Sequence, residues 1–477
     1  MGFKEDFQRE MRNVKSDVAA EVEKHWVIEF EGHIIEVMNR MLEEVVLVDG
    51  EVIAENKRKS IWSHVIPYST LVGTFVSQAG KKHKVHVKLG GFTKLNCTVK
   101  VDGQKLFVDT LKLEFLPWKN KQSIVSYIES QVAGNGCLSN YDLPDDAYLY
   151  DENQPRLAPG LALVSEPVSM MYTKKLVKLF LAQIETPTDK TRRATYEKIQ
   201  EEMVISYFQD FLSLYMQEDV DRERAQQEAI WLLENAAHRE VVKFALVILG
   251  TTECDAYVEK LKCIALHGEF TGVALFAIMN GTRNGNETVF DIAQHVHDWG
   301  KLETLNFLEP SNETVRKWFI TDGVKNSIRT SHASLICAEK GKLDIALHES
   351  QISAEIFDGA SLIVSALAKQ PDLTADYEYA GQVFMRYLKH AKEHCQTLQH
   401  FYVLTVIQEY MDVDEELWKG RYLVNWRPHE QEAVEQGIKE IAANPKWLEI
   451  ATEIINEQPE HEQAKAIVEF YQQWQLI

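Results

Sequence analysis

The sequence lacks the hydrophobic segments that mark membrane-spanning and secreted proteins. No stretch of its 477 residues approaches the roughly 18 consecutive apolar residues that a spanning helix needs. The N-terminal stretch "MGFKEDFQREMRNVKSD" is charged and has no apolar signal-peptide core. We therefore expect a protein of the cytoplasm that has no membrane partner.

Cysteine is also scarce, and no two cysteines have C-x-x-C spacing. Such scattered positions are typical of neither a zinc site nor a redox dithiol. We expect six reduced thiols and no cofactor. The cysteines are Cys97, Cys137, Cys254, Cys263, Cys337 and Cys395.

The motifs of the common enzyme classes are missing as well. The chain contains no G-x-S-x-G, no G-x-x-x-x-G-K-[ST], no G-x-G-x-x-G after a strand and no H-E-x-x-H. These absences argue against the common hydrolases, nucleotide-binding enzymes and metalloproteases. A site assembled from scattered residues stays open.

Acidic residues are abundant, and the formal net charge is −21. Residues 51–125 nevertheless hold thirteen Lys or Arg against five acids, a net of +8, so the remainder carries −29. The basic segment can dock on the chain's own acidic part or on an acidic partner. Nucleic acid is disfavoured as a partner, because lysines at alternate strand positions also keep a sheet surface soluble.

The N-terminal part has the patterns of a duplicated β-domain. Residues 3–24 are predicted to form an amphipathic helix, and "WVIEFEG" and "EEVVLVDGEVIAEN" are predicted strands. "HKVHVKLGG" and "LNCTVKVDGQKLFVDTLKLEF" form a second copy, with Asp-Gly turns at 49–50 and 102–103. Aligning Val27 on Val85 gives an offset of 58 residues between the two copies, whereas aligning the two Asp-Gly turns gives an offset of 53 residues. The first copy is therefore expected to hold five extra residues between its strands.

Two such hairpin units are expected to bury their apolar faces together as a small sandwich. A helix over 121–133 is expected to close this domain. The pattern "IEFEG" followed by "VVLVDGE" resembles the β-domain of the Fas apoptosis inhibitory molecules over about thirty residues. No function is carried over from that resemblance.

A change of amino-acid composition along the chain predicts two domains joined by a linker. Four prolines and clustered acids mark residues 136–171 as an extended linker. We therefore predict an antiparallel β-domain with flanking helices at 1–135, the linker at 136–171, and helical repeats at 172–477. The fold class is α+β.

The helical part has a repeated helix–turn–helix pattern. Turns are expected near His238, Gly268, Gly300 and Gly341, at spacings of 30, 32 and 41 residues. "EVVKFALVILG" is similar to the second helix of a HEAT-like repeat, and "CAEKGKLDIAL" has an ankyrin-like look without that family's Thr-Pro-Leu-His turn. The resemblance to HEAT-like proteins implies an α-solenoid.

The stretch "FDIAQHVHDWG" holds the main candidate site residues. On one helix over 289–300, Val289, Ile292, Ala293 and Val296 form a buried stripe, and His295 and His297 lie about 160° apart. They cannot bind one metal ion together. Trp299 lies beside His295, where the two either form a groove wall or fill the gap between repeats; we favour the second.

His390 and His394 share a helix face with Lys389 and Glu393. A solvent-exposed face is the favoured interpretation, and a metal site with these two ligands is the alternative.

These observations predict a non-catalytic scaffold that binds a protein partner, one of basic character, on the repeat surface. The candidate binding residues are His295, Trp299, His267 and Glu269. The alternative is an enzyme of unknown class with His295 and Asp298 in its site, where the β-domain meets the repeats. The oligomeric state stays open.

Overall fold

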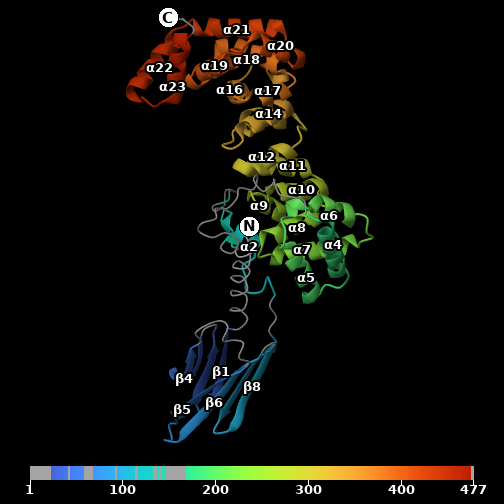
Figure 1. Cartoon of the computed structure of the whole chain (residues 1–477), viewed down its shortest axis with the longest axis vertical. Coiled ribbons are helices and arrows are strands. Elements are labelled where there is room, and N and C mark those ends of the chain that lie inside the picture. The colour runs from blue at the N-terminus through green and yellow to red at the C-terminus, as the bar shows by residue number, and fades with distance from the viewer. Residues whose placement is uncertain are drawn as a thin grey trace.

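The computed structural model describes residues 23–40, 43–57, 68–91, 94–112, 116–132, 138, 142–146 and 168–473. Two four-stranded antiparallel sheets are followed by a long array of helices (Figure 1). The predicted α+β class is therefore confirmed. The expected N-terminal helix falls, up to residue 22, outside the described residues, as does most of the expected linker.

Each sheet is built from four strands in chain order. The first comprises β1 (Lys24–Phe30), β2 (His33–Asn39), β3 (Glu43–Val48) and β4 (Glu51–Lys57). The second comprises β5 (Ser69–Val76), β6 (Lys82–Gly90), β7 (Lys94–Val101) and β8 (Gln104–Lys112). Alternate residues such as Ile35 and Val37 in β2, and Val85 and Val87 in β6, are buried in one hydrophobic cluster between the sheets.

The duplication covers whole sheets, so the sequence alignment of the two copies was wrong. The counterpart of β1 is β5 and not β6, and both β2 and β5 were missed as strands. In each copy a Phe at or next to the end of one strand pairs with a His at or next to the start of the following strand: Phe30 with His33, and Phe75 with His83. The two histidines are 50 residues apart and the two turn aspartates 53, so the second copy is the longer one.

The helix that was expected to close the β-domain belongs to the helical core instead. α2 (Ile124–Gln131) buries Ile124, Val125 and Ile128 in the same hydrophobic cluster as the later helices, and it contacts α7, α8 and α9. Leu143, from the expected linker, is buried in that cluster too. Parts of the chain before residue 172 thus contribute to the helical body.

The helical body follows in chain order. Its first half comprises α4 (Met170–Glu185), α5 (Asp189–Ile199), η3 (Val204–Ser206), α6 (Phe208–Tyr215), α7 (Arg222–Asn235), α8 (Arg239–Leu249), η4 (Asp255–Tyr257), α9 (Val258–Ala265), α10 (Thr271–Gly281), α11 (Gly285–Ala293), α12 (Asp298–Phe307) and α13 (Glu313–Trp318). Its second half comprises η5 (Phe319–Gly323), α14 (Thr330–Lys340), α15 (Leu343–Ala346), α16 (Ala354–Ala368), α17 (Pro371–Asp376), α18 (Ala380–His394), α19 (Leu398–Met411), α20 (Glu415–Val424), α21 (Pro428–Ala442), α22 (Lys446–Glu457) and α23 (Glu462–Gln473).

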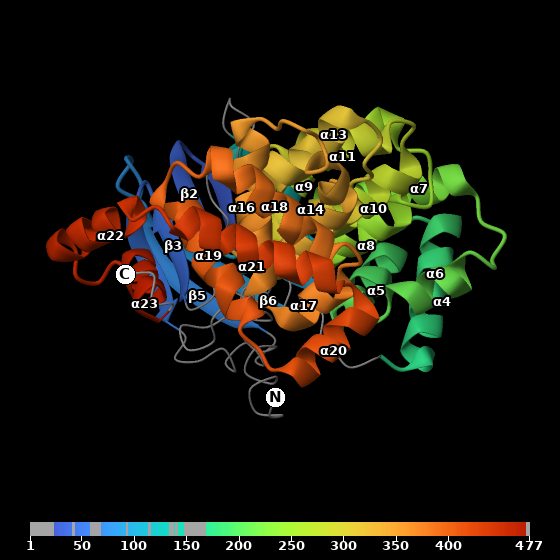
Figure 2. The same cartoon turned by 90° about the horizontal axis from the view of Figure 1, so that it is seen from above.

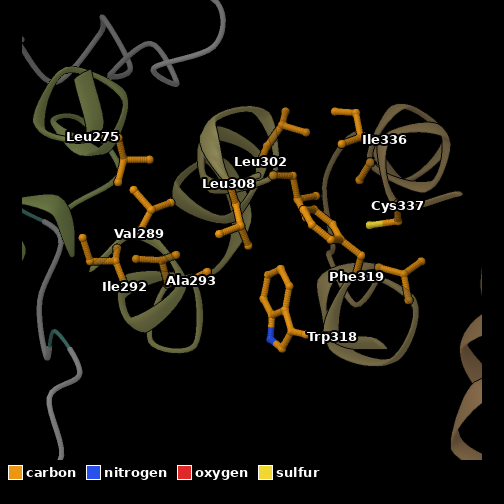
Figure 3. Packing of buried hydrophobic residues seen from close by; sticks show 14 of the residues in the cluster. Leu275, Val289, Ile292, Ala293, Leu302, Leu308, Trp318, Phe319, Ile336 and Cys337 are labelled. Atoms are coloured by element: carbon orange, nitrogen blue, oxygen red, sulfur yellow. The ribbon is translucent and has the colours of Figure 1, made fainter. Parts of the chain in front are cut away.

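Consecutive helices pack in pairs, and the second helices of the pairs stack in a row. α8, α10, α12, α14, α16 and α19 each contact the next helix of that row. The row follows the long axis of the molecule, and Figure 2 shows it from above. Apolar side chains fill the space between pairs, as Figure 3 shows for Val289, Leu308 and Phe319. The tandem repeat and the membership of the HEAT-like class both stay predictions.

The stretch "FDIAQHVHDWG" is two helices and not one, which corrects the angular argument made from the sequence. α11 ends at Ala293, the chain turns over 294–297, and α12 begins at Asp298, whose φ of 51° is left-handed. Gly300 is not the turn. It lies inside α12, where an added Cβ would come 3.1 Å from Thr271 Oγ1, so glycine lets α12 approach α10 closely.

Candidate functional site

The candidate residues at 295–299 lie in the turn before α12 and at the start of that helix. His295 and His297 are both exposed in the turn. His297 Nδ1 lies 3.0 Å from Asp298 Oδ2, and the same carboxylate accepts a hydrogen bond from Ser327. That bond is the main cause that lowers the pKa of Asp298. Trp299 is half-buried against the helical core, near Gly268.

His267 and Glu269 lie in the turn between α9 and α10, which Trp299 adjoins. His267 is buried, and its Nδ1 accepts a hydrogen bond of 3.2 Å from the Glu269 backbone N–H. His238 accepts the equivalent bond from Glu240 at 3.3 Å, just before α8. Burial lowers the pKa of His238, which favours the neutral ring that can accept this bond.

Histidines recur in the turns before three of the helices. His238, His267 and His297 precede α8, α10 and α12 at intervals of 29 and 30 residues. Two of the three accept a hydrogen bond from the backbone near the start of the following helix. His238 is the N-cap of α8, whereas His267 accepts its bond within the turn before α10 and His297 makes no capping bond to α12.

A buried charge cluster surrounds the same turns, centred on Arg239 of α8. The Arg239 guanidinium donates to Asp145 at 2.8 and 3.0 Å, and its backbone N–H donates to the same carboxylate at 2.8 Å. Asp146 accepts a further bond from Arg239. The side chains of Arg239 and Asp145 are only 3% and 1% exposed, so this is an ion pair shielded from water.

Lys243, one turn further along α8, completes this cluster. Its Nζ lies 2.8 Å from Glu240 and 2.6 Å from Glu269. Burial alone would lower the pKa of Lys243, but the two carboxylates outweigh it and raise the pKa, so Lys243 is charged. Glu240 also accepts the Val204 backbone N–H at 2.6 Å. The charges pair with one another, so the cluster joins α8 to the segment at 142–146 and to the turn before α10.

One carboxyl near Trp299 differs from this cluster. Glu303 of α12 lies against Gly272 at the start of α10, and within the described part of the chain it has no hydrogen-bond or ion-pair partner. Burial raises its pKa above the ordinary value. A desolvated, unpaired carboxyl is the kind of group that sequence patterns do not reveal.

His390 does not lie on a solvent-exposed face, which corrects that expectation. It is buried, and its Nε2 lies 3.1 Å from the Leu347 carbonyl oxygen. His394 stacks on Phe357, and the two histidine rings are 6.4 Å apart. Within the described ranges, no group of three or more His, Cys, Asp or Glu residues is placed to hold a metal ion.

A groove that the sequence did not predict lies between α19, α20 and α21. Its volume is about 490 Å³. Met411, Val413 and Trp418 give it apolar walls, and Tyr422, Gln431 and Glu435 form a hydrogen-bonded chain along one side. Other charged residues at the groove are Asp412, Glu415, Lys419 and Lys439.

The surroundings of this groove are strongly acidic. Residues 407–473 contain fifteen Asp or Glu against six Lys or Arg, a net of −9. Asp412 is exposed and makes no ion pair with any described residue, while Glu415 pairs with Lys419 at 2.9 Å in full contact with solvent. The arrangement can attract and hold cationic groups next to an apolar wall.

Comparisons with known proteins give no further assignment. No family model, no curated protein and no solved structure matches this chain. None of the helices in the described part of the chain has the length and apolar character required to cross a membrane.

Proposed function

We propose that the protein is a non-catalytic scaffold that binds a basic protein or peptide on its helical surface. The observation that supports this proposal best is the groove between α19, α20 and α21, where apolar side chains lie among the acidic residues Asp412, Glu415 and Glu435. A groove between three helices at the surface suits an extended or helical segment of a partner better than an enclosed small substrate.

The charge of the helical body favours the same partner. Residues 168–473 hold 48 acidic and 31 basic residues, a net of −17. Such a surface attracts basic proteins over distances of several ångströms and repels nucleic acid and other acidic molecules. The turn residues His267 and Glu269 support the helical body from within, because His267 is buried and the Glu269 side chain is only 8% exposed.

Affinity capture with the intact protein tests this proposal. Proteins retained at low salt are identified, purified and titrated against the full-length chain by calorimetry. We expect at least one basic protein to bind with a Kd in the micromolar range or below, and to bind more weakly as salt is raised. If no retained protein binds in the purified system, or if only acidic proteins do, the proposal is wrong.

A further inference from the structure

The outward face of α20 carries large apolar side chains that no described residue covers. Leu417, Leu423 and Val424 are 55%, 88% and 63% exposed. They are three of the six large apolar side chains in residues 168–473 that are more than half exposed; the others are Met171, Met216 and Ile345. Leu417 and Val424 lie on one side of α20, and exposed apolar surface of this kind marks interaction sites.

The opposite face of α20 fixes the helix to the body. Trp418 is buried, and its ring lies 5.3 Å from that of Trp426. The Arg421 guanidinium stacks on the Tyr410 ring at 3.7 Å and donates a hydrogen bond of 2.9 Å to the Tyr410 carbonyl oxygen. The exposed face is therefore presented in a fixed orientation.

The spacing on this face suits a second helix. Leu417, Gly420 and Val424 follow one another at i, i+3 and i+7, so they form one stripe along α20. Gly420 lies in the middle of the stripe with open space where a Cβ would be, so another helix can approach closely there. Glycine inside an exposed helix is less favourable than alanine, and a helix–helix contact would explain its presence there.

The acidic charge of this protein determines which kind of partner helix can bind the exposed face of α20. A second copy of this chain would bring two bodies of net charge −21 together, and anionic surfaces would be repelled in the same way. Glu416 lies beside Gly420 and Leu423 on the same exposed side of α20, and Asp412 and Glu415 lie at the groove on its other side. A helix with an apolar stripe and flanking Lys or Arg complements both properties.

We propose that the outer face of α20 binds an amphipathic basic helix of a partner protein. Its apolar side chains cover Leu417, Leu423 and Val424, and its basic side chains meet the acidic residues beside them. This inference rests on the proposed scaffold function and adds a recognition face on α20 next to the groove.

A designed peptide tests the inference with the full-length protein. The probe is a labelled peptide three heptads long, with Leu at positions a and d and Lys at e and g. We expect micromolar binding by fluorescence anisotropy, and at least tenfold weaker binding by the variant L417S/L423S/V424S, because central apolar contacts dominate such interfaces. The matched control M171S/M216S/I345S, which changes the other three exposed side chains, is expected to bind within twofold of the wild type.

The remaining outcomes separate the inference from the proposed function. The same peptide with Glu in place of Lys is expected not to bind. If L417S/L423S/V424S binds the Lys peptide and the captured partner as the wild type does, α20 is not the site although the scaffold function stands. If the wild type binds neither the peptide nor any captured basic protein, the scaffold function fails as well. A wild-type dimer in sedimentation that becomes monomeric in this variant would assign the face to a second copy and overturn the inference.

Discussion

At the scale of single residues, the buried ion pair between Arg239 and Asp145 decides how the segment at 142–146 is held. Replacing Asp145 by Ala leaves the guanidinium buried without its main partner, which costs about 3–5 kcal/mol. We expect the free energy of unfolding in urea to fall by about that amount. The exposed pair Arg316–Glu313, at 3.1 Å with Glu313 86% exposed, provides the control. Glu313→Ala should change the stability by less than about 1 kcal/mol, and an equal loss in both variants would contradict the structural role of the cluster.

A second prediction concerns the unpaired carboxyl of Glu303. Because burial raises its pKa in the folded state, the folded protein holds this proton more tightly than the unfolded chain does. Its contribution favours folding below the ordinary pKa of 4.5 and is lost as the pH rises through the folded-state pKa. The variant Glu303→Gln should therefore unfold at higher urea than the wild type at pH 8, with a smaller difference at pH 5. A variant less stable than the wild type at pH 8 would show that the ionised carboxylate has a stabilising partner.

The roles of Asp145 and Glu303 could not be predicted from the sequence, because both depend on contacts between distant segments. Asp145 and Arg239 are 94 residues apart and meet only because two segments fold onto each other. Glu303 is one of many helical acids, and its environment depends on Gly272 of another helix. His267 and Glu269 were selected from the sequence as candidates, and the structure places both inside the body.

At the scale of elements, the repeated His–Asp pairs fix the two sheets of the β-domain. His33 Nδ1 lies 2.6 Å from Asp49 Oδ2, and His83 Nδ1 lies 2.8 Å from Asp102 Oδ2. The other oxygen of each aspartate accepts a backbone N–H at 2.8 Å. Both histidines contact the Phe75 ring, at 5.1 and 5.2 Å between ring centroids, so the two copies meet there.

These pairs predict how the β-domain responds to acid. The bonds to His33 and Ile34 lower the pKa of Asp49, and the bonds to Lys84 and His83 lower that of Asp102. A lowered folded-state pKa stabilises the fold above the ordinary value of 3.8, and this contribution is lost as the pH falls through the folded-state pKa. At pH 4.5, pepsin should cleave residues 24–112 faster in D49N/D102N than in the wild type, and the difference should shrink at pH 2. The variant Glu51→Gln, at an exposed turn acid, is the control. Equal cleavage of wild type and D49N/D102N at pH 4.5 would contradict the prediction.

The same domain shows which elements a sequence pattern can predict. The strands beside the Asp-Gly turns were found because both turn residues adopt positive φ, which that dipeptide favours. β2 was missed because it follows a Glu-Gly turn with the same backbone geometry. β5 was missed because Gly73 interrupts its pattern. An added Cβ at Gly73 would lie 2.6 Å from the Ile53 carbonyl oxygen, so this glycine serves close strand packing and not a turn.

At the scale of the whole molecule, the class of fold could be predicted from the sequence, but the surfaces that can bind a partner could not. Periodicity shows which residues are apolar at helical or strand spacing, and this sufficed for an antiparallel β-domain followed by helices. It does not show which helix ends at the edge of the array with one face unpaired. Leu417 and Val424 have the spacing of a buried stripe, yet α20 buries Trp418 instead. The candidate groove therefore appears only once α19, α20 and α21 are placed together.

A basic partner can be attracted by the net charge of the whole molecule or by the acidic residues at the groove. Two variants distinguish these two contributions. D412N/E415Q/E435Q and E185Q/E223Q/E253Q each remove three negative charges, but only the first set lies at the groove. If overall charge alone attracts the basic peptide described above, both variants should slow its association equally. Because the field of a charge is screened over about 8 Å at physiological salt, we expect the groove variant to have the larger effect. Stopped-flow measurements should give about a tenfold slower association for D412N/E415Q/E435Q and less than a threefold change for the control, with dissociation less affected. The gap should close as salt is raised to 1 M, where screening removes the contribution of both sets; a gap that persists there would mean that the three acids act through direct contacts and not through long-range attraction.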